Sequence, residues 1–186
     1  MSWIQAEGIH FFRTEDGQVD ATPVIEDIVA EFFPTAPAYE GPRHVTIIYI
    51  GGDMTAKMKG AIRETAVCMM NNASGIMNAR PRLGNTNPKA LIWDIQAPLL
   101  SEYFRVLYTA LKAHQIPVKH TLQDGVRFHY GFAPHITLAE FESEEEATAA
   151  WESCDKQALS ERLSAFTNVD LTEFKVYDQN EVPVEI

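Results

Sequence analysis

Two short stretches of the chain place a histidine and a threonine two residues apart, each followed by an apolar residue. They are His44-Val45-Thr46-Ile47 and His135-Ile136-Thr137-Leu138, the second of which is preceded by Pro134. Strict alternation of polar and apolar residues predicts a β-strand, with the histidine and threonine on one face. Alternate residues of a strand lie about 7 Å apart. Each pair is therefore spaced to hold one phosphate-sized group.

The residue types in these pairs suit acid-base chemistry at a phosphodiester. Two imidazoles with an ordinary pKa of about 6.5 can act as general base and general acid at neutral pH. The base activates the attacking hydroxyl and the acid protonates the leaving oxygen, while the hydroxyls of Thr46 and Thr137 donate to the non-bridging oxygens. This scheme needs no metal. The sequence leaves open which of His44 and His135 is the base.

The pattern of apolar residues predicts the elements that must position these side chains. Segments 44–50 and 135–141, which contain the motifs, are predicted strands that each follow one helix and precede another. We interpret this as a duplicated unit folded as two lobes of one domain, 1–186, with one motif in each lobe. The further predicted strands are 3–13, 75–84, 89–96 and 171–177, and the predicted helices are 20–32, 53–72 (capped by Asp53), 98–114, 143–154 and 155–166.

Composition and charge restrict the class of partner. The formal net charge is −11, from 26 acidic and 15 basic residues. Proteins that bind long nucleic acid usually carry a basic stripe, so long duplexes are disfavoured as partners. No apolar run is long enough to span a membrane. The two cysteines, Cys68 and Cys154, indicate neither a disulfide framework nor a cysteine-based metal site. With no apolar signal segment at the start, we expect a cytoplasmic protein, and a monomer.

The two motifs resemble the signature pairs of the 2H phosphoesterase superfamily, which includes 2′-5′ RNA ligases and 2′,3′-cyclic phosphodiesterases. Ala90–Trp93 ahead of a helix and the closing segment Leu171–Tyr177 are also similar to that family. The resemblance implies an α+β fold, that is, a two-lobed, pseudo-symmetric arrangement of antiparallel sheets flanked by helices around a central cleft. It also implies that His44, Thr46, His135 and Thr137 are the catalytic residues of a metal-independent enzyme without a cofactor.

The resemblance leaves the substrate open. It implies cleavage or closure of a 2′,3′-cyclic, 2′-5′ or related nucleotide phosphate. Some phage members of the family destroy cyclic oligonucleotide signals in the host cytoplasm. Acidity favours a small nucleotide, a cyclic oligonucleotide or an RNA end over long RNA. The alternatives are a nucleotide-binding sponge without catalysis, an enzyme that processes or ligates RNA ends, and an interaction domain whose histidines are structural.

The long connection at 116–133 is a candidate for substrate selection, because connections of this length in compact domains are usually functional. It contains Arg127, Phe128, Tyr130 and Phe132 just before the second motif. A cation interleaved with aromatic rings can hold a phosphate and stack a base, so these four residues are candidate substrate-binding residues. Equally, the aromatic rings can serve only to anchor the loop to the core.

Other titratable residues are assigned by their positions in the predicted elements. Lys119 and His120 lie in the same connection and are weaker candidates for the cleft. Arg43 adjoins the first motif, but alternation points it away from the catalytic face. His10 and His114 are interpreted as structural, His114 because it follows the apolar stripe of a predicted helix.

Overall fold

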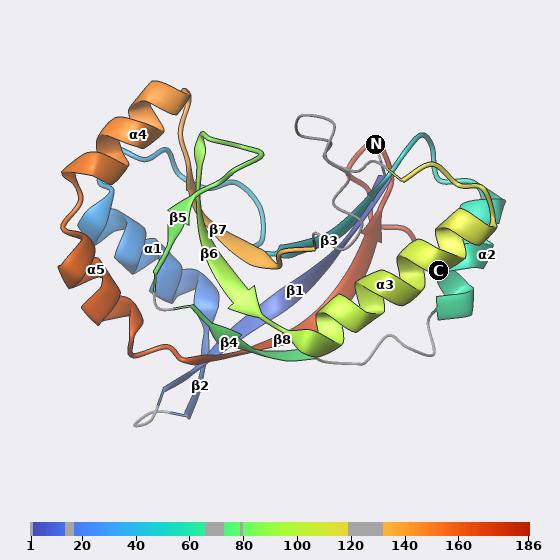
Figure 1. The fold of residues 1–186 in the computed structure, drawn as a ribbon, viewed down its shortest axis with the longest axis horizontal. Helices are drawn as coiled ribbons and strands as arrows, with labels where there is room; N and C mark the ends of the chain where they lie inside the picture. Colours follow the sequence, from blue (N-terminus) through green and yellow to red (C-terminus); the bar gives the residue numbers. More distant parts are fainter. Residues whose placement is uncertain (1, 14–16, 66–72, 79, 119–131) are drawn as a thin grey trace.

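The computed structural model describes residues 2–13, 17–65, 73–78, 80–118 and 132–186. These residues form one antiparallel, eight-stranded sheet that bends through the molecule, with helices on its outer side (Figure 1). The predicted arrangement of antiparallel strands flanked by helices in two lobes is confirmed. No helix in these ranges is long and apolar enough to cross a membrane.

The first lobe is built around a long strand, β1 (Ser2–Arg13). Along one side it pairs with β8 (Asn168–Tyr177) through nearly all of its length. Its other side pairs with β3 (Val45–Ile50) near the N-terminus and with β2 (Gly17–Asp20) at the far end. The strand carrying the first motif is therefore held against the centre of this lobe.

The second lobe is built around β6 (Ala90–Gln96). This strand lies between β5 (Arg82–Leu83) and β7 (His135–Glu140), and all three are antiparallel neighbours. A short strand, β4 (Ala73–Met77), pairs with both β8 and the end of β6, and so joins the two lobes into one sheet. The strand carrying the second motif is β7.

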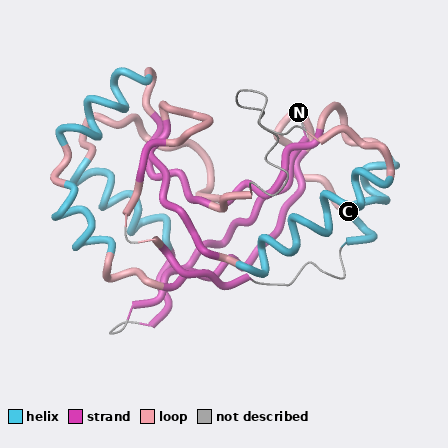
Figure 2. Tube along the Cα trace, viewed as in Figure 1, coloured by secondary structure: helices cyan, strands magenta, loops and turns pink. Residues whose placement is uncertain are grey.

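Two groups of helices cover the two lobes (Figures 1 and 2). Helices α2 and α3 pack against each other beside the first lobe, whereas α1, α4 and α5 lie on the second. Side-chain caps at Asp20, Ser143 and Asp155 explain where three of the helices begin, because each accepts a hydrogen bond from a free backbone N–H of the first turn. The bounds are α1 Ala21–Phe32, α2 Ala56–Thr65, α3 Pro98–Ala113, α4 Glu144–Ser153 and α5 Lys156–Leu163.

Helix α3 shows how apolar spacing places a helix. Leu100, Tyr103, Leu107 and Leu111 lie on one face and are buried. Fully burying a leucine contributes roughly 1.5–3 kcal/mol, so this stripe anchors the helix to the sheet. The predicted helix at 98–114 is therefore confirmed to within one residue.

Two predicted elements had wrong boundaries, and one strand was missed. The strand predicted at 75–84 is two strands, β4 and β5, because Asn78 bonds back to Asp94 and Pro81 has no N–H to continue a ladder. The helix predicted from Asp53 begins at Ala56, since the hydroxyl of Thr55 accepts from the Met58 N–H in its place. The hairpin partner of β1, the short strand β2, was not predicted.

Candidate active site

The two predicted motifs line one cavity between the lobes. Its volume is about 540 Å³, and His44, Thr46, His135 and Thr137 are all among its lining residues. In each motif the histidine and threonine are half-buried, and the intervening residue is fully buried. The structure thus brings together four side chains that lie in two distant parts of the sequence.

The local structure of the first motif includes a bulge. Strand β3 pairs Ile48 with Ile4 and Thr46 with Gln5, so that Ile47 is an extra residue with no partner on β1. A bulge of this kind changes the direction of the side chains that follow it.

The second motif contains the same irregularity at the equivalent position. Strand β7 pairs Ala139 with Leu91 and Thr137 with Ile92, which leaves Leu138 as the extra residue. The bulge therefore follows the threonine in both motifs. Segments 42–49 and 133–140 consequently share one sequence of exposed, half-buried and buried positions.

The bulges turn one further residue of each strand into the cavity. After two consecutive buried positions, Tyr49 and Glu140 are exposed, and both line the cavity beside the motif residues. Strict alternation without a bulge would have turned Ile48 and Ala139 toward it. The sequence contains no direct signal for a bulge, so this pair was not predicted.

The rings of the two histidines are held in the same way. Nδ1 of His44 lies 3.1 Å from the carbonyl oxygen of Pro42, and Nδ1 of His135 lies 2.9 Å from that of Ala133. A carbonyl oxygen only accepts, so Nδ1 donates in both cases. Nε2 of each neutral ring is then left with a lone pair for a proton. Both histidines are oriented for acid-base work through Nε2.

The electrostatic surroundings of His44 favour its neutral form. Burial lowers the pKa of His44 below its ordinary value, and the nearby charges of His135 and Arg43 act in the same direction. The carbonyl of Pro42 and the carboxylate of Glu7 oppose this lowering only in part. At neutral pH the ring is therefore able to accept a proton.

Arg43 connects the two motifs from behind. Its side chain is buried, and its Nη1 donates to the carbonyl oxygens of Thr137 at 2.7 Å and Leu138 at 2.9 Å. The guanidinium also lies 3.9 Å from the centre of the Tyr39 ring. Arg43 is not a lining residue of the cavity, but it binds the backbone of the opposite motif, which alternation alone did not reveal.

The floor of the cavity beside β3 is aromatic. Trp3 is the register partner of Tyr49 on one side and of Tyr177 on the other. The rings of Trp3 and Tyr177 are stacked, with centroids 5.2 Å apart and planes 12° from parallel. Trp3 and Tyr49 line the cavity.

A hydrogen-bonded network supports this floor. Trp3 Nε1 donates to Gln5 Oε1 at 2.7 Å, and Gln5 Nε2 donates to Glu7 Oε1 at 2.7 Å. Glu7 also accepts from Lys175 and from the hydroxyl of Tyr177. Burial alone would raise the pKa of Glu7, but these donors outweigh it and lower the pKa. Burial and the bond to Glu7 raise the pKa of Tyr177 to about 12.

The opposite end of the cavity is polar and acidic. Glu140 lines it and accepts a hydrogen bond from Asn87 Nδ2 at 3.0 Å. Tyr39 and Thr86 complete this end. Among the described residues that line the cavity, none is Lys or Arg.

The candidate substrate-binding residues of the loop are mostly outside the described residues. This applies to Arg127, Phe128 and Tyr130, as it does to Lys119 and His120. Phe132 is described: its ring stacks on Phe104 of α3, with centroids 4.9 Å apart, and it packs against the core. It does not line the cavity. For Phe132 the contact favours the alternative that the ring anchors the loop.

Two other histidines have partners away from the cavity. His10 bonds through Nδ1 to the carbonyl of Gly8, and His114 lies 2.9 Å from a carboxylate oxygen of Glu64. Neither lines the cavity. In the described part of the chain, no three His, Cys, Asp or Glu side chains are grouped to hold a metal ion.

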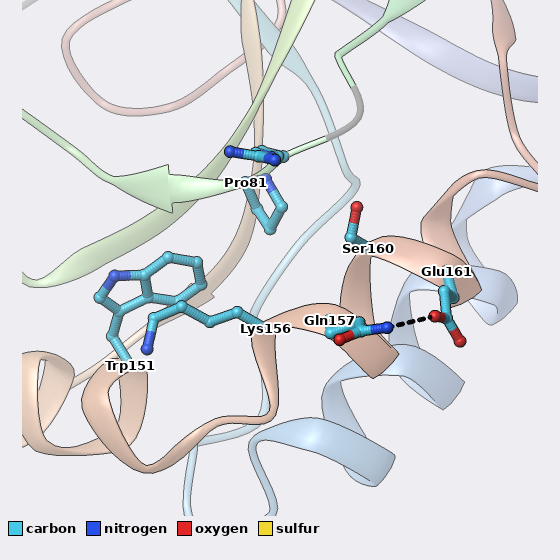
Figure 3. Close-up of a pocket in the computed structure, with 7 residues that line it drawn as sticks. Pro81, Trp151, Lys156, Gln157, Ser160 and Glu161 are labelled. Atoms are coloured by element: carbon cyan, nitrogen blue, oxygen red, sulfur yellow. Dashed lines mark hydrogen bonds between the residues drawn. The ribbon is translucent and has the colours of Figure 1, made fainter.

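A second cavity, of about 620 Å³, lies on α4 and α5 at the outer side of the second lobe (Figure 3). Its floor is Pro81 and the indole of Trp151, over which Lys156 Nζ lies 5.1 Å from the ring centre. Gln157 and Glu161 are hydrogen-bonded at its edge. It contains no histidine and none of the motif residues, so the cavity between the lobes is the candidate active site.

Comparison with known proteins identifies the fold. No family profile and no curated protein sequence matches the chain. Among solved structures, Usb1 of Kluyveromyces marxianus matches with a TM-score of 0.51 at 9% identity, over 100% of this chain and 97% of that one. Usb1 with uridine monophosphate matches with a TM-score of 0.51 at 11% identity, over 98% of both chains. The MHV ns2 PDE domain gives a TM-score of 0.47 at 12% identity, over 76% of this chain and 84% of that one.

At such low identities the likeness concerns the fold. The match to Usb1 covers the whole chain. This protein therefore shares the fold of Usb1, an α+β fold of antiparallel strands flanked by helices, as the resemblance of the motifs implied.

Proposed function

We propose that the protein is a phosphodiesterase that cleaves a nucleotide phosphodiester by paired-histidine acid-base catalysis. The observation that carries this proposal is the equivalence of the two motifs: both place a histidine and a threonine in one cavity, with each imidazole held through Nδ1. A fold shared with 2H phosphodiesterases is consistent with it.

The proposed reaction follows from the geometry of the two rings. The attacking hydroxyl or water gives its proton to Nε2 of one histidine as its oxygen bonds to phosphorus. The P–O bond to the leaving group breaks, and the leaving oxygen takes a proton from Nε2 of the other histidine. Burial lowers the pKa of His44 and so favours its neutral ring, and we therefore assign it the role of base and give that of acid to the other histidine. Thr46 and Thr137 donate to the non-bridging oxygens.

The proposed substrate is a small nucleotide, a cyclic oligonucleotide or an RNA end. The acidic end of the cavity, together with a net charge of −11, disfavours a long polyanion. Usb1 has been solved with uridine monophosphate, which is consistent with a nucleotide in this fold. A cytoplasmic site of action and a monomeric state belong to the same proposal.

The test is a panel of 2′,3′-cyclic, 2′-5′-linked and 3′-5′-linked nucleotides, incubated with the protein and read by mass spectrometry. We expect at least one to be cleaved at an unchanged rate in EDTA. Activity abolished by EDTA and restored by a divalent metal would contradict the proposal. Intact nucleotide recovered from a tight complex would favour a sponge instead, and ligated products an RNA ligase.

A further inference from the structure

The two ends of the cavity differ in chemistry although the strands that form them are equivalent. From the centre of the molecule, β3 leads toward α2 and β7 leads toward α4, on opposite lobes (Figure 1). Tyr49 and Glu140 occupy the same position after the bulge on these two strands. At this one equivalent position β3 therefore has an aromatic ring and β7 has a carboxylate, although the lining also includes Glu181 after β8 and the ring of Tyr39. We call these ends the aromatic arm (Trp3, Tyr49) and the acidic arm (Asn87, Glu140).

The aromatic arm has the properties of a stacking surface. Tyr49 is 44% exposed and lines the cavity together with Trp3, so its ring is accessible to a ligand in the cavity. Its register partner Trp3 is already stacked on Tyr177 on the far side. Rings on neighbouring strands can extend such a stack to a planar ligand, and every nucleobase has a π-face.

The polar atoms of Trp3 and of the Tyr177 ring stacked on it are bonded within the protein. Trp3 Nε1 is bonded to Gln5, and the Tyr177 hydroxyl is bonded to Glu7. Gln5 and Glu7 are each only 4% exposed. The rings of Trp3 and Tyr177 are thus held before a ligand arrives, so little of their conformational entropy is lost on stacking.

The acidic arm presents a negative charge instead of a stacking surface. The Glu140 carboxylate is exposed at the cavity, and its described hydrogen-bond partner is the neutral amide of Asn87. A second phosphate in this arm would face that charge without a described lysine or arginine among the lining residues. A hydroxyl or amino group, in contrast, can donate to the carboxylate.

We propose that the aromatic arm is a nucleobase-binding site and that the acidic arm excludes a further phosphate. The inference rests on the proposed function and specifies its substrate. That substrate has a base on Trp3 and Tyr49, one phosphate between the two threonines, and an uncharged group at Glu140. A cyclic mononucleotide or a dinucleotide fits this description, whereas a longer chain with a phosphate beyond the cleaved bond does not.

Binding measurements test the aromatic arm without requiring turnover. Uridine 5′-monophosphate and ribose 5-phosphate are a matched pair with and without a base, and calorimetry gives the affinity for each. We expect Tyr49→Ala to weaken binding of the uridine nucleotide by roughly 5- to 150-fold and to leave ribose 5-phosphate unchanged. Tyr49→Phe, which keeps the ring, is expected to restore binding.

Tryptophan fluorescence gives a second readout of stacking. The nucleotide is expected to quench the wild-type protein and to lose most of this effect in Trp3→Phe. The matched control is Trp151→Phe, in the outer cavity, which is expected to retain the quenching. Equal weakening of both ligands in Tyr49→Ala, or no binding of the nucleotide to the wild type, would overturn the proposal.

The acidic arm is tested with two deoxydinucleotides, thymidylyl-(3′→5′)-thymidine and the same compound with a 3′-terminal phosphate. The second compound carries a phosphate beyond the one that lies between the threonines. In Glu140→Gln the dinucleotide with the terminal phosphate is expected to gain roughly 5-fold in affinity relative to the one without it. Glu145→Gln removes the same charge from the exposed face of α4 and is expected to leave the ratio unchanged. An unchanged ratio in Glu140→Gln would contradict exclusion by this carboxylate.

The outcomes also separate this proposal from the proposed function. If the nucleotide stacks on the aromatic arm but no substrate in the panel is cleaved, catalysis is refuted and the binding site stands. If substrates are cleaved but Tyr49→Ala and Trp3→Phe bind and react like the wild type, only the binding site is refuted.

Discussion

The two motif strands, β3 and β7, are alike within the motif and different around it. Both have a histidine bonded through Nδ1 to the carbonyl two residues earlier, and both have a bulge after the threonine. Ahead of its histidine, however, β3 has the buried cation of Arg43, whereas β7 has Pro134, whose carbonyl accepts from Ile95. The features that the two strands share suit proton transfer on both sides of one phosphate. The residues that differ can orient a substrate whose two groups on that phosphate are not alike.

The sharpest way to test the equivalence is to remove each imidazole separately. We expect His44→Ala and His135→Ala each to lower kcat by at least ~10²–10⁴-fold, because each removes one proton-transfer group. The double variant is expected to be little worse than either single one, since base and acid act in one step. Rates are measured on the substrate found in the panel, with circular dichroism as the control for folding. Full activity in either variant would refute the paired mechanism.

The two threonines should also be equivalent if both donate to the phosphate. Thr46→Val and Thr137→Val keep the shape of the side chain and remove the hydroxyl. We expect each to lower kcat by ~10²–10³-fold, the effect of losing one donor to the developing charge. A large effect for one threonine and none for the other would show that the phosphate binds to one motif only.

Among the features in which the two strands differ, the buried Arg43 should contribute most to the free energy of unfolding of the protein. Arg43→Ala leaves the carbonyls of Thr137 and Leu138 without their donor. We expect the free energy of unfolding to fall by about 1.5–3 kcal/mol, the range for a bond to a charged group. Urea denaturation measures this.

The matched control is Arg63→Ala, at an exposed position in the last turn of α2, for which we expect a change within about 0.5 kcal/mol. Arg43→Lys should recover only part of the loss, because a single ammonium does not reproduce the planar guanidinium over Tyr39. Equal stability of the Arg43→Ala variant and the wild type would show that this link between the motifs is unimportant.

The smallest expected effect is on the pH profile. Burial lowers the pKa of His44, and a general base must be neutral to act. The rising limb of kcat/KM with pH should therefore have its midpoint below the ordinary histidine pKa of about 6.5. This midpoint is measured by kinetics between about pH 4.5 and 9 at fixed ionic strength, and the pKa of His44 is measured by NMR titration. A midpoint above that value would assign the base to another group.

Local patterns in the sequence were sufficient to predict the motif strands and most of the helices. Alternation around Val45 and Ile136 placed each histidine on the same face as its threonine, since the direction of a side chain along a strand depends only on the next few residues. Helix α3 was equally predictable from the spacing of its apolar residues. At 75–84 the local pattern predicted one strand, but pairing with different neighbours divides this segment into β4 and β5, so the prediction was wrong.

The sequence by itself was sufficient to predict the reactive groups of the candidate site, two imidazoles and two hydroxyls, and the α+β fold that holds them. Only the tertiary structure decided what surrounds them. The bulges at Ile47 and Leu138 arise from register with β1 and β6, and they turn Tyr49 and Glu140 into the cavity. Trp3 reaches the same cavity only through the pairing of β1 with β3. Such contacts join residues far apart in the chain, so no local pattern encodes them.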